Sequence, residues 1–465
     1  MSRQGSLGQT AREIFTSKSG FTALLILLGI LCFSGAAQFY IPFEVVDKWN
    51  SPQFWQGLPQ LAAPVWSGLL SGKVLPQTIL VKEADFIKYS YVVQAIGVKY
   101  ITLVGQFNYA YDGFPSELAA VITAAYDRDR PLMNIRLERP DGSNVTLVSG
   151  AINNPTNYLY LSVDNEVKAR VLDFAEAQGS NDPKAVYPEI ILFAAKGQDM
   201  GDESKNAVLK GTYRVRIDVT TTGINDDIDA EFRVYGQVYG LAGTDNKRRD
   251  LLVGLVWGAP VALAFGLSAA IVTSVFQALM GSLSAWYGGI VDEITQRITD
   301  VYMILPFLPI LITVSVIYRI DILTLLLIVV LLSLLGGMTK TARSMTLQVM
   351  TEQYIEAARS YGASKRRILL YYIMPRLVPY IVANIVLAVP AFVFLEAAMS
   401  LLGLGDPRVP TWGKMIGDAY SGGAAIHGLW WWILLPSALI ILTAAAFAFL
   451  GYALDRVVNP RLRER

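Results

Sequence analysis

The chain has very few residues of the kinds that build disulfides and metal sites. Cys32 is the single cysteine and His427 the single histidine among 465 residues. One cysteine cannot form an intramolecular disulfide, and His427 has no cysteine or histidine partner at ligand spacing, so we expect no metal site. Cys32 lies in an apolar run, where its expected role is that of a small apolar filler.

Charge is also scarce. Only 17% of the residues are charged while 53% are hydrophobic, and the formal net charge is +1. A soluble domain carries about 25% charged residues, so this composition predicts an integral membrane protein surrounded by lipid. A net charge near zero gives no reason to expect nucleic acid as a partner.

The chain lacks a glycine-rich phosphate loop. The segment "GGMTK", which begins at Gly336, does not have the spacing that lets backbone amides surround phosphates. We therefore expect no catalytic residues, no metal and no ATP or Mg²⁺ site in this chain. Any energy source for its function must lie on another subunit.

Six stretches are long and apolar enough for transmembrane helices, which need about 17–25 residues. They are residues 19–43, part of 251–291, 301–318, 322–339, a run from near Leu377 past Glu396, and 428–454. The first resembles a signal peptide in its basic flank but lacks a small-residue cleavage site, so we favour a retained anchor.

The basic residues predict the orientation, because Lys and Arg near span ends stay on the cytoplasmic side. The loop 340–376 contains seven Lys/Arg and two Glu, and both termini are basic. We expect a multi-pass protein of the cell membrane with both termini and this loop in the cytoplasm. The group "NKRRD" at 246–250 would lie outside, against the rule, but it adjoins a segment long enough to translocate regardless of charge.

The predicted organisation is a cytoplasmic N-terminus (1–18), a first transmembrane helix (19–43), an extracytoplasmic domain (44–242) and a core (243–465) with transmembrane helices 2–6. In the outer domain, alternation at 213–219 predicts a half-buried strand, and Asp141-Gly142 predicts a hairpin. Segments 116–126 and 164–177 look helical. The pattern leaves an α+β or a mainly β fold open, and it indicates no compact group of aromatic and charged residues.

A short element interrupts the loop 340–376. In "YIEAARSYG" (354–362), Ala357 and Ala358 give a helix with a small surface for close approach, and Gly362 is placed to end it. A basic loop that only sets the topology would look similar, and the residue pattern leaves both interpretations open.

This segment, with "YIMP" ending at Pro375, resembles the EAA loop of ABC importer permeases. The resemblance implies that Glu356, Ala357, Ala358 and Gly362 belong to a coupling helix that docks on an ATPase subunit. Tyr372-Ile373-Met374-Pro375 departs at two positions from the usual Ile-x-Leu-Pro ending.

Three more segments are similar to the C-type subunit of the dipeptide/oligopeptide permease group. They are Gly243–Ala259, where Arg248 replaces a usual glycine, Leu395–Ala419, and the last span with its Asn459-Pro460-Arg461-Leu462 finish. The resemblance covers the first span and the chain from Gly243 onward, and it leaves the outer domain unexplained.

The resemblance implies an ABC type I importer-like fold and a permease subunit that imports peptides. The implied partners are a second permease subunit, two ATPase subunits that hold ATP and Mg²⁺, and an extracytoplasmic substrate-binding protein. Gly243, Thr244, Asp245 and Glu396 would be external gate or structural residues, with a structural partner for Glu396 favoured over substrate contact. The substrate stays open, since relatives handle sugars, nickel and opines.

Two other classes remain as alternatives. A membrane-anchored sensor with an outer ligand domain would need a cytoplasmic effector domain, which we do not find in the sequence. A secondary transporter would show inverted repeats and several charges within its spans, and we see neither.

Overall fold

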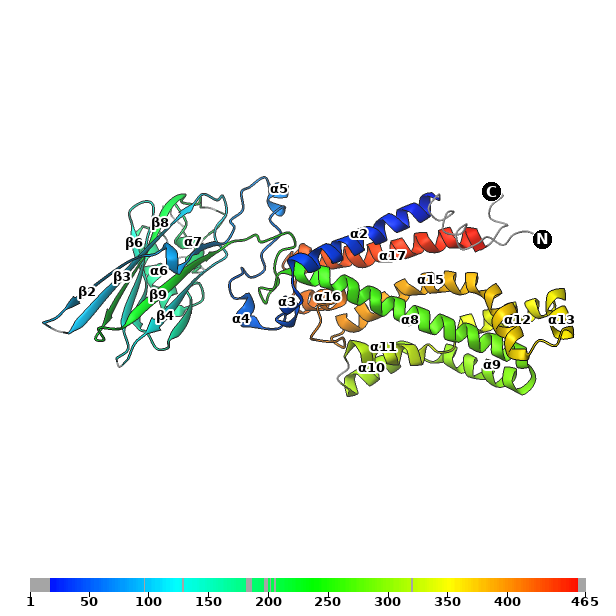
Figure 1. Cartoon of the computed structure of the whole chain (residues 1–465). Coiled ribbons are helices and arrows are strands. Elements are labelled where there is room, and N and C mark those ends of the chain that lie inside the picture. Colours follow the sequence, from blue (N-terminus) through cyan, green and yellow to red (C-terminus); the bar gives the residue numbers. More distant parts are fainter. Residues whose placement is uncertain are drawn as a thin grey trace. The chain divides into compact units, whose positions relative to one another are not determined.

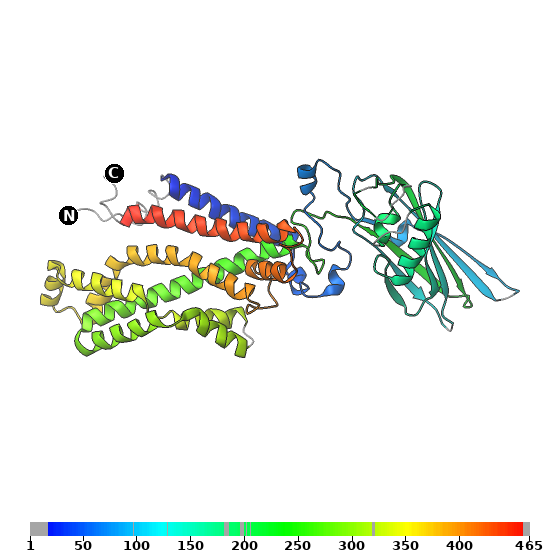
Figure 2. The same ribbon diagram turned by 180° about the vertical axis from the view of Figure 1, so that it is seen from behind.

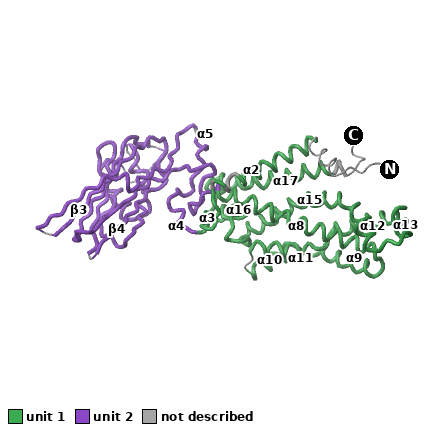
Figure 3. Tube along the Cα trace, viewed as in Figure 1, with its two compact units in different colours: residues 1–50, 253–465 green, residues 51–252 purple. Residues whose placement is uncertain are grey.

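The computed structural model describes residues 17–458 except 96, 128, 181–185, 196–199, 201, 205 and 319–320. The chain divides into two compact units, residues 51–252 and residues 1–50 with 253–465 (Figure 3). Arg3 and Arg12 of the N-terminal segment and the "NPRLRER" finish lie outside the described residues. Gly243–Asp250, which the sequence assigns to the permease core, belongs to the unit 51–252.

The unit formed by residues 1–50 and 253–465 is helical (Figures 1 and 2). Its elements are α2 (Lys18–Tyr40), α3 (Phe43–Asp47), α8 (Leu251–Tyr287), α9 (Gly289–Ile304), α10 (Phe307–Ile317), α11 (Ile322–Leu332), α12 (Gly337–Met350), α13 (Gln353–Ser360), α14 (Lys365–Ile368), a π-helical turn (Leu369–Ile373), α15 (Met374–Leu401), α16 (Trp412–Ser421) and α17 (Trp430–Val458). The helix α2 lies along α17 in both views, although these helices come from opposite ends of the chain.

Four helical stretches of the described chain are long and apolar enough to cross a membrane, and six if each of two bent pairs counts as one span. The pairs are α9 with α10, bent by 74°, and α11 with α12, bent by 48°. The predicted continuous helices 301–318 and 322–339 are therefore wrong. Leu305 precedes Pro306 and has ψ 131°, because a proline disfavours helical geometry in the residue before it. The second break lies at residues 333–336. It ends at the first of two consecutive glycines, residues 336 and 337, and glycine is a poor helix former.

The unit 51–252 is a β-sandwich. One antiparallel sheet has the order β1-β9-β4-β7 and the other β2-β3-β8-β5-β6. The strands are β1 (Ile79–Val81), β2 (Ile87–Val93), β3 (Val98–Tyr109), β4 (Glu117–Ala125), β5 (Leu132–Glu138), β6 (Asn144–Ala151), β7 (Thr156–Tyr160), β8 (Gly211–Thr221) and β9 (Asp227–Tyr235). Short helices α4 (Pro52–Trp55), α5 (Ser67–Ser71), α6 (Asn165–Ala177) and α7 (Pro188–Ile191) and a 3₁₀ turn (Glu83–Asp85) complete it.

The sandwich core joins both sheets through aromatic side chains. Phe107 on β3 stacks on Tyr213 of β8 at 5.4 Å and on Phe232 of β9, in the opposite sheet, at 6.2 Å. Phe193 stacks on Tyr213 at 4.5 Å. The predicted strand at 213–219 is confirmed, and its alternate residues from Tyr213 to Val219 are buried.

The predicted hairpin is confirmed as β5 and β6, with Gly142 in the left-handed region at φ 83°. The predicted helix at 164–177 is confirmed as α6, capped by Asp164. The predicted helix at 116–126 is wrong, because this segment forms β4 between β9 and β7. Residues 118–122 are all buried, so the strand has no polar face and shows no alternation that would distinguish it from a buried helix. The fold is mainly β.

Glycines let α16 approach its neighbours at backbone distance. A Cβ added at Gly413 would lie 2.4 Å from the Cα of Ala397 on α15. On α8, a Cβ at Gly258 would lie 2.7 Å from the ring of Trp412, and one at Gly254 the same distance from the sulfur of Met415. The helix α16 thus meets α15 backbone to backbone at Gly413, and it packs the side chains of Trp412 and Met415 on the glycines of α8.

We expect Gly413→Ala to destabilise the helical unit, because its Cβ meets the backbone of α15 and the helices must separate, at a cost of about 1–3 kcal/mol. The matched control is Gly29→Ala on α2, where an added Cβ meets nothing within 4 Å. Thermal unfolding in detergent should show a lower Tm for Gly413→Ala and an unchanged or slightly higher Tm for Gly29→Ala. Equal melting temperatures for the two variants would contradict the close packing.

Candidate functional site

The predicted helix in the loop 340–376 is present as α13. It ends where Tyr361 donates to the carbonyl of Ala357 and Gly362 to that of Arg359. Gly362 has φ 74°, the left-handed geometry that glycine adopts without strain at a helix end. The expectation that Gly362 ends the helix is confirmed.

The two alanines of this helix lie on different faces, about 100° apart around the helix axis. Ala358 is buried together with Ile355, in a cluster that includes Met338 and Ala342 of α12. Glu356 and Ala357 are exposed. The expectation that both alanines form one outward surface is wrong for Ala358, because positions three apart share a helix face and Ile355 fixes that face inward.

Two cation–ring contacts hold α13 in place. The guanidinium of Arg359 lies 5.1 Å from the ring centre of Trp286 on α8, and that of Arg376, on α15, lies 5.3 Å from the ring of Tyr354. Such contacts stabilise by about 0.5–1 kcal/mol at exposed positions. The helix is thus attached to both α8 and α15.

The outward side of α13 is open. Besides Glu356 and Ala357 it includes Ser360 and Tyr361, and Tyr361 is 91% exposed. The basic residues 365–367 on α14 are exposed too. This side offers a small residue, a carboxylate and an aromatic ring next to a positive cluster, and these groups suit contact with another protein.

Ion pairs between α9 and α12 support this element from behind. Arg343 makes a two-pronged pair with Asp292, at 2.6 Å from Nε and 2.5 Å from Nη2, and Lys340 pairs with Asp300. A Cβ at Gly281 of α8 would lie 2.2 Å from the carbonyl oxygen of Thr339, so α8 and α12 touch through backbone. These pairs were not predicted from the sequence, because 51 residues separate Asp292 from Arg343 and no local spacing links them.

Glu396 has a hydroxyl partner within the protein. Its side chain is buried on α15 and accepts a 2.8 Å hydrogen bond from Ser400. Thr411, 3.4 Å from the Ser400 hydroxyl, caps α16 by accepting from the amide of Lys414. The carboxyl group therefore connects α15 to the start of α16 through the hydroxyl of Ser400.

The loop after α15 is tied to the start of α11. Asp406 accepts from the amide of Arg408 at 2.9 Å and from that of Ile322 at 3.3 Å. Arg408 also lies 3.7 Å from Asp321, which caps α11. Burial alone would raise the pKa of Asp406, but its hydrogen bonds from Arg408 hold that pKa below its ordinary value.

Gly243, Thr244 and Asp245 lie together in the unit 51–252, while Glu396 belongs to the other unit. Thr244 and Asp245 are fully buried, and Asp245 accepts from Nε of Arg249 at 2.6 Å. Burial raises the pKa of Asp245 in spite of this partner. Burial also raises the pKa of Asp250, which accepts from the amide of Leu252 at the start of α8, to about 6.

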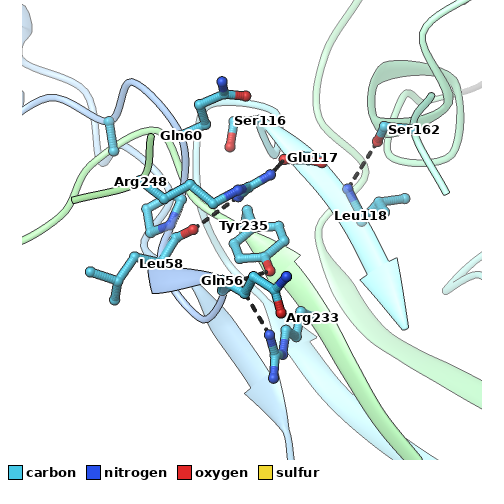
Figure 4. A network of polar contacts seen from close by, with 12 residues as sticks. Gln56, Leu58, Gln60, Ser116, Glu117, Leu118, Ser162, Arg233, Tyr235 and Arg248 are labelled. Atoms are coloured by element: carbon cyan, nitrogen blue, oxygen red, sulfur yellow. Dashed lines mark hydrogen bonds and ion pairs between the residues drawn. The ribbon is translucent and has the colours of Figure 1, made fainter. Parts of the chain in front are cut away.

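The unit 51–252 contains a compact aromatic and charged group that the sequence analysis did not foresee. Arg248 pairs with Glu117 and lies over the ring of Tyr235 at 4.7 Å (Figure 4). The sequence feature that could have indicated this group is Arg248 itself, which stands where the resembled permease group usually has a glycine.

Comparison with known proteins identifies the family to which this sequence is similar. Residues 277–464, which include α13, match the family described as "Binding-protein-dependent transport system inner membrane component". The dipeptide transport system permease protein DppC of Bacillus subtilis is 32% identical over 224 residues, which cover 48% of this chain and 68% of that protein. The chain belongs to this permease family.

Two further relatives are also permease proteins, with similar identity and coverage. The oligopeptide transport system permease protein OppC of Bacillus subtilis is 31% identical over 48% of this chain and 72% of its own length, and OppC of Lactococcus lactis subsp. cremoris is 31% identical over 48% and 76%. The expected membership is confirmed. This permease is a multi-pass membrane protein and a transport subunit of an ABC transporter rather than an enzyme.

The different burial of Ala357 and Ala358 generates a paired prediction. Ala358→Glu puts a carboxylate among buried apolar groups, which costs several kcal/mol unless the helix detaches. Ala357→Glu puts the same group in water and should change stability by no more than about 0.5 kcal/mol. Melting in detergent should therefore show a large loss of Tm for Ala358→Glu alone. Equal behaviour of the two variants would show that α13 is oriented differently.

Proposed function

We propose that this permease is the C-type subunit of an ATP-driven importer of peptides and forms the translocation path with a second permease subunit. The observation that carries the proposal is α13, a short helix within the matched region 277–464 that exposes Glu356 and Ala357 and ends at Gly362. The names of DppC and OppC, which refer to dipeptide and oligopeptide transport, support the substrate class.

The proposed topology has six spans. The helices α2, α8, α15 and α17 each cross once, and each bent pair counts as one more crossing. Both termini and the loop 340–376 lie in the cytoplasm, and residues 44–242 lie outside. The seven basic residues of the loop support this orientation.

The proposed partners follow from this arrangement. Two ATPase subunits hold ATP and Mg²⁺ and receive α13 on the cytoplasmic side, while a binding protein delivers substrate outside. Closure of the ATPases on ATP presses on α13, whose inward residues Ile355 and Ala358 pass the load to α12 and α15. The two sites are coupled only as far as ATP favours one of the two states of the spans.

The coupling role is tested with Ala357→Glu and the matched control Ala357→Ser. The glutamate adds bulk and charge at the exposed face and should lower peptide uptake and binding-protein-stimulated ATP hydrolysis by about tenfold, a typical magnitude for a lost coupling energy. The serine variant should transport at the wild-type rate. Assembly is checked by co-purification with the second permease. Normal uptake by an assembled Ala357→Glu complex would refute a docking role for α13.

The sandwich is proposed to contact the binding protein rather than to bind substrate itself. Photo-reactive amino acids at Tyr89, Tyr158 and Ile224, which are 58%, 50% and 67% exposed, should cross-link to the binding protein in the assembled transporter. The same group at Tyr361 should cross-link to an ATPase subunit instead. If none of the three sandwich positions captures the binding protein, or if labelled peptide alone cross-links to them, the proposed role of the sandwich is wrong.

A further inference from the structure

Arg248 has an unfavourable backbone conformation. Its φ is 65°, and among the described residues Leu61 at φ 54° is the only other non-glycine residue with a positive φ. The left-handed region costs a residue with a Cβ about 1–2 kcal/mol, so glycine is the default there. At this position the side-chain contacts of the arginine must offset the free-energy cost of its backbone conformation.

The side chain of Arg248 makes four contacts within the unit 51–252. It donates to the carbonyl of Leu58 at 2.9 Å and pairs with Glu117, and both charged side chains are largely buried. Its guanidinium lies over the rings of Tyr235 at 4.7 Å and Tyr160 at 5.9 Å. Figure 4 shows the guanidinium directed to Glu117 beside Tyr235. A planar cation with several donors can satisfy all of these at once, whereas a lysine cannot.

The contacted residues lie at the ends of two sandwich strands. Glu117 begins β4, and Tyr235 ends β9 directly opposite it in the antiparallel pair. Tyr235 and Arg233 both donate to the carbonyl of Gln56, at 2.5 and 3.2 Å. Residues 56–58 are therefore held to the same strand ends as Arg248.

The two chain connections of the sandwich are hydrogen-bonded to each other. The amide of Thr244 donates to Ala62 at 2.8 Å, and the amide of Ala62 donates back to the Thr244 hydroxyl at 2.9 Å. Leu61 donates to the carbonyl of Asp245, and the Thr244 hydroxyl to Pro59 at 2.7 Å. We call residues 56–62 and 243–250 the paired connection. Both positive-φ side-chain-bearing residues lie in it, and backbone strain of this kind persists where surrounding contacts hold it.

We infer that Arg248 is a positioning residue that makes the sandwich and the paired connection one rigid body. The paired connection is followed directly in the chain by α8, which begins at Leu251. The rigidity stands on the contacts above. Its use in transport rests on the proposed function, in which a binding protein loads the sandwich.

The experiment measures rigidity directly in the assembled transporter. The native cysteine is removed by Cys32→Ala, and spin labels are attached to Ser149→Cys on β6 and Lys247→Cys in the paired connection, both exposed. Pulsed dipolar spectroscopy then gives the distribution of label distances. Arg248→Gly relieves the backbone strain, so the unit should stay folded, and Glu117→Gln removes the ion pair without touching the backbone near the label. Arg248→Lys keeps the positive charge but loses the planar guanidinium group with its several hydrogen-bond donors.

We expect a narrow distribution in the wild type, a width increased about twofold or more by Arg248→Gly and by Glu117→Gln, and an intermediate width for Arg248→Lys, since contacts that close a hinge limit its motion. A purely stabilising role would lower the Tm without changing the width measured below it. Unchanged widths in both variants overturn the inference.

Uptake distinguishes this inference from the proposed function. With Arg248→Gly, broadened distances together with reduced binding-protein-stimulated ATP hydrolysis support both. If the distance distributions broaden while transport stays normal, Arg248 makes the connection rigid but this rigidity is not used in coupling. That result would count against the proposal that the binding protein docks on the sandwich.

Discussion

The helical unit depends on the packing of α16, which meets the backbone of α15 at Gly413 and packs Trp412 and Met415 on the glycines of α8. Lipid does not drive apolar helices together, so association in a bilayer needs dense packing and polar contacts between helices. Gly413 and Gly258 allow that packing, and the indole nitrogen of Trp412 adds a 2.8 Å hydrogen bond to the carbonyl of Leu255. The Glu396–Ser400 bond and the Thr411 cap then fix where α16 begins.

The permease has few charged residues, and several of them form ion pairs with side chains that are close in space. Arg343 meets Asp292 between α12 and α9, and charges are paired in the same way in "NKRRD", the group that the proposed topology places outside against the positive-inside rule. Arg248 and Arg249 of "NKRRD" pair with Glu117 and Asp245, so this group carries less free charge than its sequence suggests. A rule that counts basic residues cannot see this, because the partner of Arg248 lies 131 residues away.

The sequence predicted what depends on local pattern and missed what depends on contacts. Long apolar runs, the strand at Tyr213, the α6 helix and the glycine end of α13 follow from periodicity and conformational preference. The strand β4 was misassigned because burial on both faces removes the alternation. The break at Leu305 was predictable in principle, since Pro306 disfavours helix in the residue before it, but the apolar composition hid it. The inward turn of Ala358 depends on which neighbours α13 finds, and no spacing gives that.

In the proposed function a short helix must transmit force, and α13 has an attached face and an exposed face. An isolated helix of eight residues is not stable in water, so its shape depends on the cluster of Ile355 and Ala358 with α12 and on the cations over Trp286 and Tyr354. The same contacts attach it to α8, α12 and α15. In the proposed cycle a push on Glu356 and Ala357 is therefore a push on three helices at once. One of them, α15, carries Glu396 and its link to α16, and it meets α16 backbone to backbone at Gly413, so in the proposed cycle these contacts would join α13 to α16 through α15.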